Sequence, residues 1–204
     1  MEKRKAFGFF ERVLALALCA CLMSGAQGAQ MQRTLAEKVV RLHVVANSDA
    51  PEDQRVKLSV RDAVLALSQK LLAGAENASD AQEKLRAGLG AIEDAANAAL
   101  EASGYGYTAR AVLSQEEYPE RAYEDFSLPA GEYCSLLVRL GQAQGKNWWC
   151  VVFPALCTSS DPSAAAADAG LTDAQIGWIR PDGKTVVRFR LAEFFRELRR
   201  SIFG

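Results

Sequence analysis

The sequence predicts an α+β fold of two layers, in which a mainly antiparallel sheet packs against two central helices and a short C-terminal helix follows. Three observations predict it. A β-branched apolar segment lies near residue 40, two segments of helical periodicity follow it, and short alternating segments separated by turn residues come last. Helices grouped between one early strand and several later strands are typical of an α+β sandwich. Half of the 204 residues are hydrophobic and 24% are charged, so the chain can bury its own core.

Residues 1–28 have the three-part layout of an export signal. Lys3, Arg4 and Lys5 precede an apolar run over residues 13–23, and small residues follow it. The run is shorter than the ~20 apolar residues that span a bilayer, which favours a cleavable signal peptide. The alternatives are an uncleaved N-terminal membrane anchor and a lipid-modified Cys21. We therefore expect a secreted protein that touches a membrane only through this leader, if the leader is retained.

The first predicted strand covers residues 38–46, and the first helix follows directly. Asp49, with Glu52 three residues later, has the spacing of a helix cap, and Pro51 suits the first turn. Apolar residues then recur at helical spacing from Val56 to Leu71. Gly74 predicts the end of this helix.

The second predicted helix starts with Ser79 and Gln82, which have capping-box spacing, and its apolar stripe reaches Leu100. Strands are then predicted over residues 107–113, 131–140 and 147–153, with turns at residues 128–131 and 141–145. Strands joined by such short turns indicate antiparallel pairing.

The predicted domain covers residues 29–157. Residues 158–177 are rich in Ser, Ala and Asp without apolar periodicity, which predicts a linker or loop. Residues 178–204 are expected to complete the domain with a strand at 186–189 and a helix at 191–203.

The composition argues against an enzyme. His43 stands alone in an apolar strand, and no pair of cysteines has the C-x-x-C spacing of a zinc or redox site. The chain has no hydrolase or phosphate-binding motif. We predict no catalytic, cofactor-binding or metal-binding residues. A formal net charge of −1 gives no reason to expect a nucleic-acid partner.

Three cysteines lie outside the leader. Cys150 and Cys157 flank a short apolar segment, so a small disulfide loop that leaves Cys134 free is one interpretation, since export permits disulfides. Three buried free cysteines are the other.

Adjacent residues on a strand point to opposite faces, so Trp148 and Trp149 cannot both face the same layer. The outward ring is either a partner anchor, because aromatic residues dominate binding hot spots, or is covered by the C-terminal segment. Stacking on a sugar ring is a further alternative.

These same segments resemble the stage II sporulation protein R family. The matching residues are 41–49, 53–54 with Lys57, 60–64, 129–133, 140–141 and 145–157. The run Asn147-Trp148-Trp149-Cys150 with the Val-Val-Phe-Pro that follows it is the most specific part. Two features depart from the family pattern: Ala155 stands where the family usually has a second proline, and Cys134 is additional.

The resemblance implies a protein made in the forespore during endospore formation and exported into the space between forespore and mother cell. There it would activate a membrane-embedded aspartic protease of the mother cell, which removes the pro-sequence of sigma factor E. An exported cell-wall-binding module or hydrolase is the alternative. The candidate partner-binding residues lie beside strand ends: Arg41, Asn47, Ser48, Asp49, Pro129, Gly131, Glu132, Tyr133, Asn147, Trp148 and Trp149. If the first strand lies beside the later ones, these ends are expected to cluster on one edge.

Overall fold

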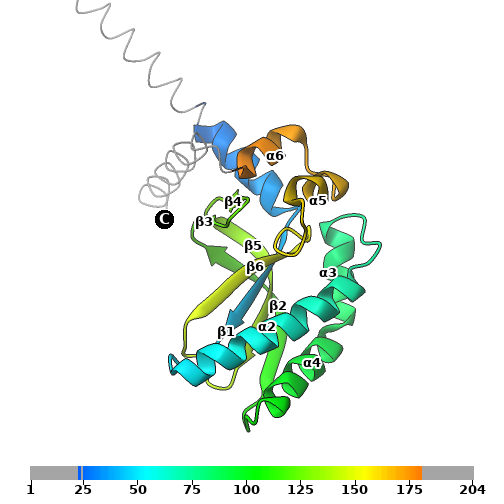
Figure 1. Cartoon of the computed structure of the whole chain (residues 1–204). Coiled ribbons are helices and arrows are strands. Elements are labelled where there is room, and N and C mark those ends of the chain that lie inside the picture. The colour runs from blue at the N-terminus through cyan, green and yellow to red at the C-terminus, as the bar shows by residue number, and fades with distance from the viewer. Residues whose placement is uncertain (1–22, 24, 181–204) are drawn as a thin grey trace, which may run out of the picture.

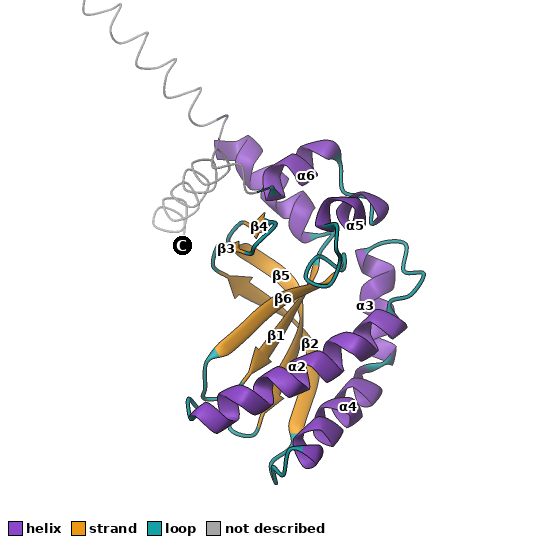
Figure 2. Cartoon of the chain, in the orientation of Figure 1, coloured by secondary structure: helices purple, strands orange, loops and turns teal. Residues whose placement is uncertain are grey.

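The computed structural model describes residue 23 and residues 25–180 (Figure 1). Three helices lie on one side of a four-stranded sheet, as the view coloured by secondary structure shows (Figure 2). The helices are α2 (Pro51–Leu71), α3 (Ala78–Ala87) and α4 (Leu89–Ala102). The strands are β1 (Val40–Val45), β2 (Ala109–Tyr118), β5 (Gly131–Leu140) and β6 (Asn147–Phe153). The predicted α+β class is confirmed. The strand predicted at 186–189 and the helix predicted at 191–203 lie outside the described residues.

The four strands are arranged in the order β2-β5-β1-β6. β1 pairs parallel with β5 and antiparallel with β6, and β2 pairs antiparallel with β5. The expectation that strands joined by short turns pair with each other is therefore wrong for β5 and β6, because β1 lies between them. Their connection folds around the end of β1 instead, where Gly145 N donates to Ala46 O at 2.9 Å and Gln144 N donates to Asn47 O at 3.1 Å.

The second predicted helix is two helices, α3 and α4, which meet at Gly88. A Cβ atom at Gly88 would lie 2.6 Å from Leu71 Cδ1, so glycine allows the end of α2 to pack closely against the junction.

Two predicted helix caps are wrong. Asn77, not Ser79, caps α3, because its side chain accepts a hydrogen bond from Asp80 N at 3.0 Å. The N-cap of α2 is Ala50, with Pro51 at the first turn and no capping side chain. The Asp49 carboxylate accepts from Lys146 N at 2.7 Å instead.

Residues 158–177 are not a plain linker, because they contain α5 (Pro162–Asp168) and most of α6 (Asp173–Ile179). Asp161 caps α5 through the backbone N–H groups of Ser163 and Ala164, and Thr172 forms a capping box with Gln175. Helices this short show little periodicity in a sequence, and their caps define them.

Residues 25–36 are helical and precede β1. This helix lies beside the α5–α6 region (Figure 1), since Gln175 Nε2 donates to Thr34 Oγ1 at 3.3 Å, and Lys38 Nζ, just after the helix, donates to Gly170 O at 2.7 Å. The expected domain boundary at residue 29 therefore falls within a helix. In residues 25–180, no helix combines the length and the apolar character needed to cross a bilayer.

The core lies between the sheet and α2, α3 and α4. Leu42 and Leu136 are neighbours on β1 and β5 and are fully buried. Val60 of α2 and Ile92 of α4 are also fully buried. Short strands β3 (Arg121–Ala122) and β4 (Ser127–Leu128) form a separate two-stranded sheet.

Candidate functional site

Trp148 and Trp149 lie on opposite faces of the sheet. Trp148 pairs with Val44 and Trp149 with His43. The Arg61 guanidinium of α2 lies 4.9 Å from the centre of the Trp148 ring, so Trp148 faces the helices. The Arg121 guanidinium of β3 lies 3.9 Å from the Trp149 ring on the other face. Both rings are partly buried, and an arginine lies over each.

The side chains around Trp149 form one connected group, which we call the Trp149 cluster. Its members are Arg41, His43, Glu116, Tyr118, Arg121, Tyr133 and Trp149. The His43 ring lies 5.7 Å from the Trp149 ring and 6.1 Å from the Tyr118 ring. The Tyr118 ring lies 5.9 Å from Tyr133 in an edge-on arrangement. Aromatic contacts between strands thus join all four strands of the main sheet on this face.

His43 and Glu116 form a partly buried pair in the cluster. His43 Nδ1 lies 3.1 Å from Glu116 Oε1. Burial tends to raise the pKa of the Glu116 carboxyl, but hydrogen bonds from His43, Ser135 and Tyr118 outweigh it and hold that pKa below its ordinary value. His43 Nε2, on the other side of the ring, is buried and has no hydrogen-bond partner among residues 25–180.

Arg41 is the largest fully buried side chain of the described residues. Its guanidinium lies 3.8 Å from the Tyr118 ring centre and 5.1 Å from that of Tyr133, and Nη2 donates to the Tyr123 hydroxyl at 2.8 Å. Nε and Nη1 have no hydrogen-bond partner in the described part of the chain. Burying a charge without a counter-charge is unfavourable by several kcal/mol, and here the tyrosine rings compensate only in part.

The predicted turn at Asn47, Ser48 and Asp49 is held by the buried carboxylate of Asp53. Asn47 Nδ2 and Ser48 Oγ donate to Asp53 Oδ2 at 2.8 Å and 2.6 Å, and the Tyr107 hydroxyl donates to Asp53 Oδ1 at 2.7 Å. Burial raises the pKa of Asp53, but these hydrogen bonds outweigh it, so the pKa lies below its ordinary value.

The same turn organises the connection between β5 and β6. Asn47 Oδ1 accepts from Gln142 N at 2.9 Å, and Asp49 Oδ1 accepts from Lys146 N at 2.7 Å. Lys57 Nζ donates to Lys146 O at 2.9 Å. The structure thus brings the 47–49 turn together with Asn147, which is exposed at the start of β6. Asn47 and Ser48 thus both make side-chain hydrogen bonds within the chain.

The turn at residues 129–133 lies at the opposite end of the sheet, so the expected cluster of all three strand ends does not form. Cys134, just after this turn, pairs with Val40, whereas the other two ends meet at Val45. The Tyr133 hydroxyl donates to the Pro129 carbonyl at 2.8 Å, and both residues are buried. A Cβ at Gly131 would overlap the Gln32 side chain. Glu132 is exposed.

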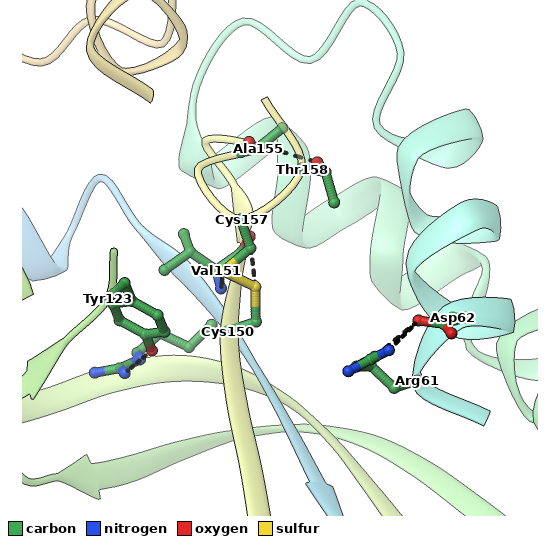
Figure 3. The surroundings of a disulfide bond; sticks show 9 residues. Arg61, Asp62, Tyr123, Cys150, Val151, Ala155, Cys157 and Thr158 are labelled. Carbon is green, nitrogen blue, oxygen red and sulfur yellow. Dashed lines mark hydrogen bonds and ion pairs between the residues drawn. A yellow bond between two sulfur atoms is a disulfide. The ribbon is translucent and has the colours of Figure 1, made fainter. Parts of the chain in front are cut away.

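Cys150 and Cys157 are joined by a disulfide, with Cα atoms 6.1 Å apart (Figure 3). Cys134 is free and buried, and burial raises the pKa of its thiol. Val151 N donates to Cys157 Sγ at 3.2 Å, so the loop closes against β6. Tyr123 and Arg61 appear on either side of β6 in Figure 3, which agrees with the alternation of Trp148 and Trp149.

The alternative of a hydrolase needs His43 or Cys150 beside a second titratable group in a cleft. His43 has that partner in Glu116, but none of the described nucleophilic side chains hydrogen-bonds its Nε2 atom. The Cys150 sulfur is in the disulfide. A pocket of about 230 Å³ lies elsewhere, between the end of α2, the disulfide loop and α5. No group of three or more metal-binding side chains occurs in the described residues.

Several members of the cluster were not predicted from the sequence. Glu116 and Tyr118 lie beyond the predicted strand 107–113, because β2 extends to Tyr118. Glu116 and Tyr118 are two residues apart, so they share one face of a strand, and this spacing was the signal available in the sequence. No sequence signal places Arg121 over Trp149, since that contact depends on how the segment after β2 folds back.

One family model covers most of the residues that the structure describes. Residues 36–162 match the family model described as stage II sporulation protein R. The chain is 33% identical over 121 residues to the stage II sporulation protein R of Bacillus subtilis (strain 168). That alignment covers 59% of this chain and 54% of the relative, so the chain matches about half the length of this curated relative. No solved structure matches the chain.

Proposed function

Because this chain belongs to the stage II sporulation protein R family, we propose that it is an exported signal of endospore formation that activates a membrane-embedded aspartic protease. That protease, in the mother cell, then removes the pro-sequence of sigma factor E. The chain acts as a ligand of the protease and has no enzymatic activity of its own. The observation that carries the proposal is the family match over residues 36–162, which includes every strand of the sheet.

Export is the second part of the proposal. The protein is made in the forespore and acts in the space between the forespore and mother-cell membranes. The basic and apolar leader supports it. The Cys150–Cys157 disulfide supports it as well, since disulfides persist mainly in oxidising compartments.

An activating ligand must bind the active state of its receptor more tightly than the inactive state. A rigid scaffold with side chains presented on one sheet face suits this role, because the ligand then spends little of its binding energy on ordering itself.

The test is reconstitution of the signal in a non-sporulating bacterial host. The chain, the protease and pro-sigma-E are produced together, and the precursor is followed by immunoblot. We expect processing only when all three are present. A variant lacking residues 1–28 should stay in the cytoplasm and leave the precursor intact. Processing at the full level by that cytoplasmic variant would contradict the need for export, and processing without the chain would contradict the activator role.

A further inference from the structure

The two faces of the main sheet differ in what covers them. Helices α2, α3 and α4 cover one face (Figure 2). On the other face, alternation along β1, β2 and β5 places His43, Val112 and Leu137 in one row with Trp149. Val112 is 40% exposed, one of three large hydrophobic residues exposed among those described. This face is therefore exposed at Val112 and partly exposed at Trp149, whereas Leu137, between them in the row, is buried.

The same face carries a cluster of positive charge. Arg41 and Arg139 lie on it by register, and Arg121 of β3 lies over Trp149. The strands of the main sheet place one carboxylate on it, Glu116, which is held by His43. Arg110 lies on the same face by register, but it reaches Glu93 at 3.6 Å. The whole chain, in contrast, has a net charge of −1, so the positive charge is a property of this face.

The buried nitrogen atoms of Arg41 that lack acceptors indicate that a partner of this face would carry hydrogen-bond acceptors. Arg41 Nε and Nη1 are buried and have no hydrogen-bond partner among the described residues. A fully buried guanidinium acts through a low dielectric, so its charge reaches the neighbouring surface with little screening. The Arg121 guanidinium, exposed over the Trp149 ring, extends this field to solvent. A carboxylate binds a guanidinium through two parallel hydrogen bonds.

From these observations we infer that the sheet face around Trp149 is the docking surface for an acidic segment of a partner protein, whose carboxylates bind Arg121 and offset the charge of Arg41. An aromatic anchor beside arginines is the composition of a binding hot spot. The identity of this partner rests on the proposed function. Under it, the acidic segment belongs to the part of the protease that faces the space between the forespore and mother-cell membranes.

The chain supplies a matched control for the charge. Arg121 and Arg61 each lie over a tryptophan of β6, but on opposite faces. We expect Arg121→Glu to lower pro-sigma-E processing and protease binding by at least about tenfold, because like charges then meet across the interface. Arg61→Glu should change both by less than about twofold. Equal effects of the two variants, or no effect of Arg121→Glu at an unchanged melting temperature, would overturn the inference.

The chain also supplies a matched pair of positions for cross-linking. Val112 is 40% exposed on the Trp149 face and Leu58 is 39% exposed on α2. The photo-reactive residue p-benzoylphenylalanine is placed at either position in the full chain, which is produced together with the protease. A cross-link to an acidic segment of the protease from position 112 and not from position 58 supports the inference. A cross-link to residues 181–204 of the same chain, to a second copy of it, or to the protease from position 58 alone, would overturn it.

The two proposals fail in different ways. If the precursor is processed without this chain, the proposed activator role is wrong whatever surface binds. If processing requires the chain but is unaffected by Arg121→Glu and gives no cross-link from position 112, the activator role stands and the docking surface is wrong.

Discussion

Asp53 illustrates how a single buried side chain fixes the turn that precedes its own helix. It is 6% exposed, and its carboxylate accepts from Asn47, Ser48 and Tyr107. These donors come from the turn after β1 and from the segment before β2. Hydrogen bonds to a charged acceptor contribute about 1.5–3 kcal/mol each to stability, so this group is a main attachment of the 47–49 turn.

Asp53→Asn should lower the free energy of unfolding by about 2 kcal/mol at pH 7, because a neutral amide accepts fewer and weaker hydrogen bonds. The folded pKa of Asp53 lies below its ordinary value of 3.8. Its contribution is therefore fully present above about pH 4 and is lost as the pH falls through the folded pKa. Urea unfolding from pH 7 to pH 2.5 should show the two proteins converging in stability. Asp62→Asn, at an exposed surface pair, is the control, and a constant difference between Asp53→Asn and wild type at all pH values would contradict the assignment.

Among the elements, α3 shows that a cap two residues away from the expected one changes where a helix begins. Asn77 caps it and the hydrogen bond to Asp80 N is 3.0 Å. Ser79, which the sequence favoured, lies inside the helix.

Asn77→Ala should lower the free energy of unfolding by about 1 kcal/mol, which is the usual loss for an N-cap side chain. Ser79→Ala should be neutral or slightly stabilising, because alanine is the better helix former inside a helix. Thermal unfolding by circular dichroism measures both. If Ser79→Ala were the more destabilising of the two, the cap would be at Ser79 and the helix start described above would be wrong.

The elements also show which parts of the fold a sequence can reveal. The bounds of β5 and β6 agree with prediction, since alternating apolar residues end at glycine-rich turns there. The break at Gly88 was not predictable, because its reason is the contact with Leu71 of a different helix. Pairing order was not predictable either, since a short turn fixes how close two strand ends lie but not whether a third strand enters between them.

The candidate site was predictable only in part. Arg41, Tyr133 and Trp149 were expected, and all three belong to the Trp149 cluster. Asn47, Ser48 and Asp49 were expected as binding residues, and the structure employs them in hydrogen bonds within the chain. A polar turn residue has the same appearance in a sequence whether its partner is another protein or its own carboxylate.

On the scale of the whole molecule, the disulfide holds the segment that follows β6 near the end of the region matched by the family model. It joins Cys150 in the buried part of β6 to Cys157, which lies seven residues later beyond the strand. The connection from the sheet to α5 is thereby held against β6.

Replacing both Cys150 and Cys157 by serine should lower the free energy of unfolding by about 2.5 kcal/mol, the chain-entropy value for a loop this short. Reductant should destabilise the wild type by a similar amount and leave the double variant unchanged. Cys134→Ala is the control and should remain sensitive to reductant. Mass spectrometry after denaturing alkylation without reductant should find Cys150 and Cys157 blocked and Cys134 labelled. Labelling of all three would show that the disulfide is absent from the protein.

The central position of β1 has a consequence for the order of synthesis. β1 is made first, yet both of its neighbours in the sheet, β5 and β6, are made last, and the hydrogen bond between Asp49 and Lys146 joins residues 97 positions apart. Contacts this distant in the chain form late and slowly. A nascent chain therefore lacks a complete sheet until residue 153 has left the ribosome, and it remains threadable through a translocation channel for nearly the whole of its synthesis.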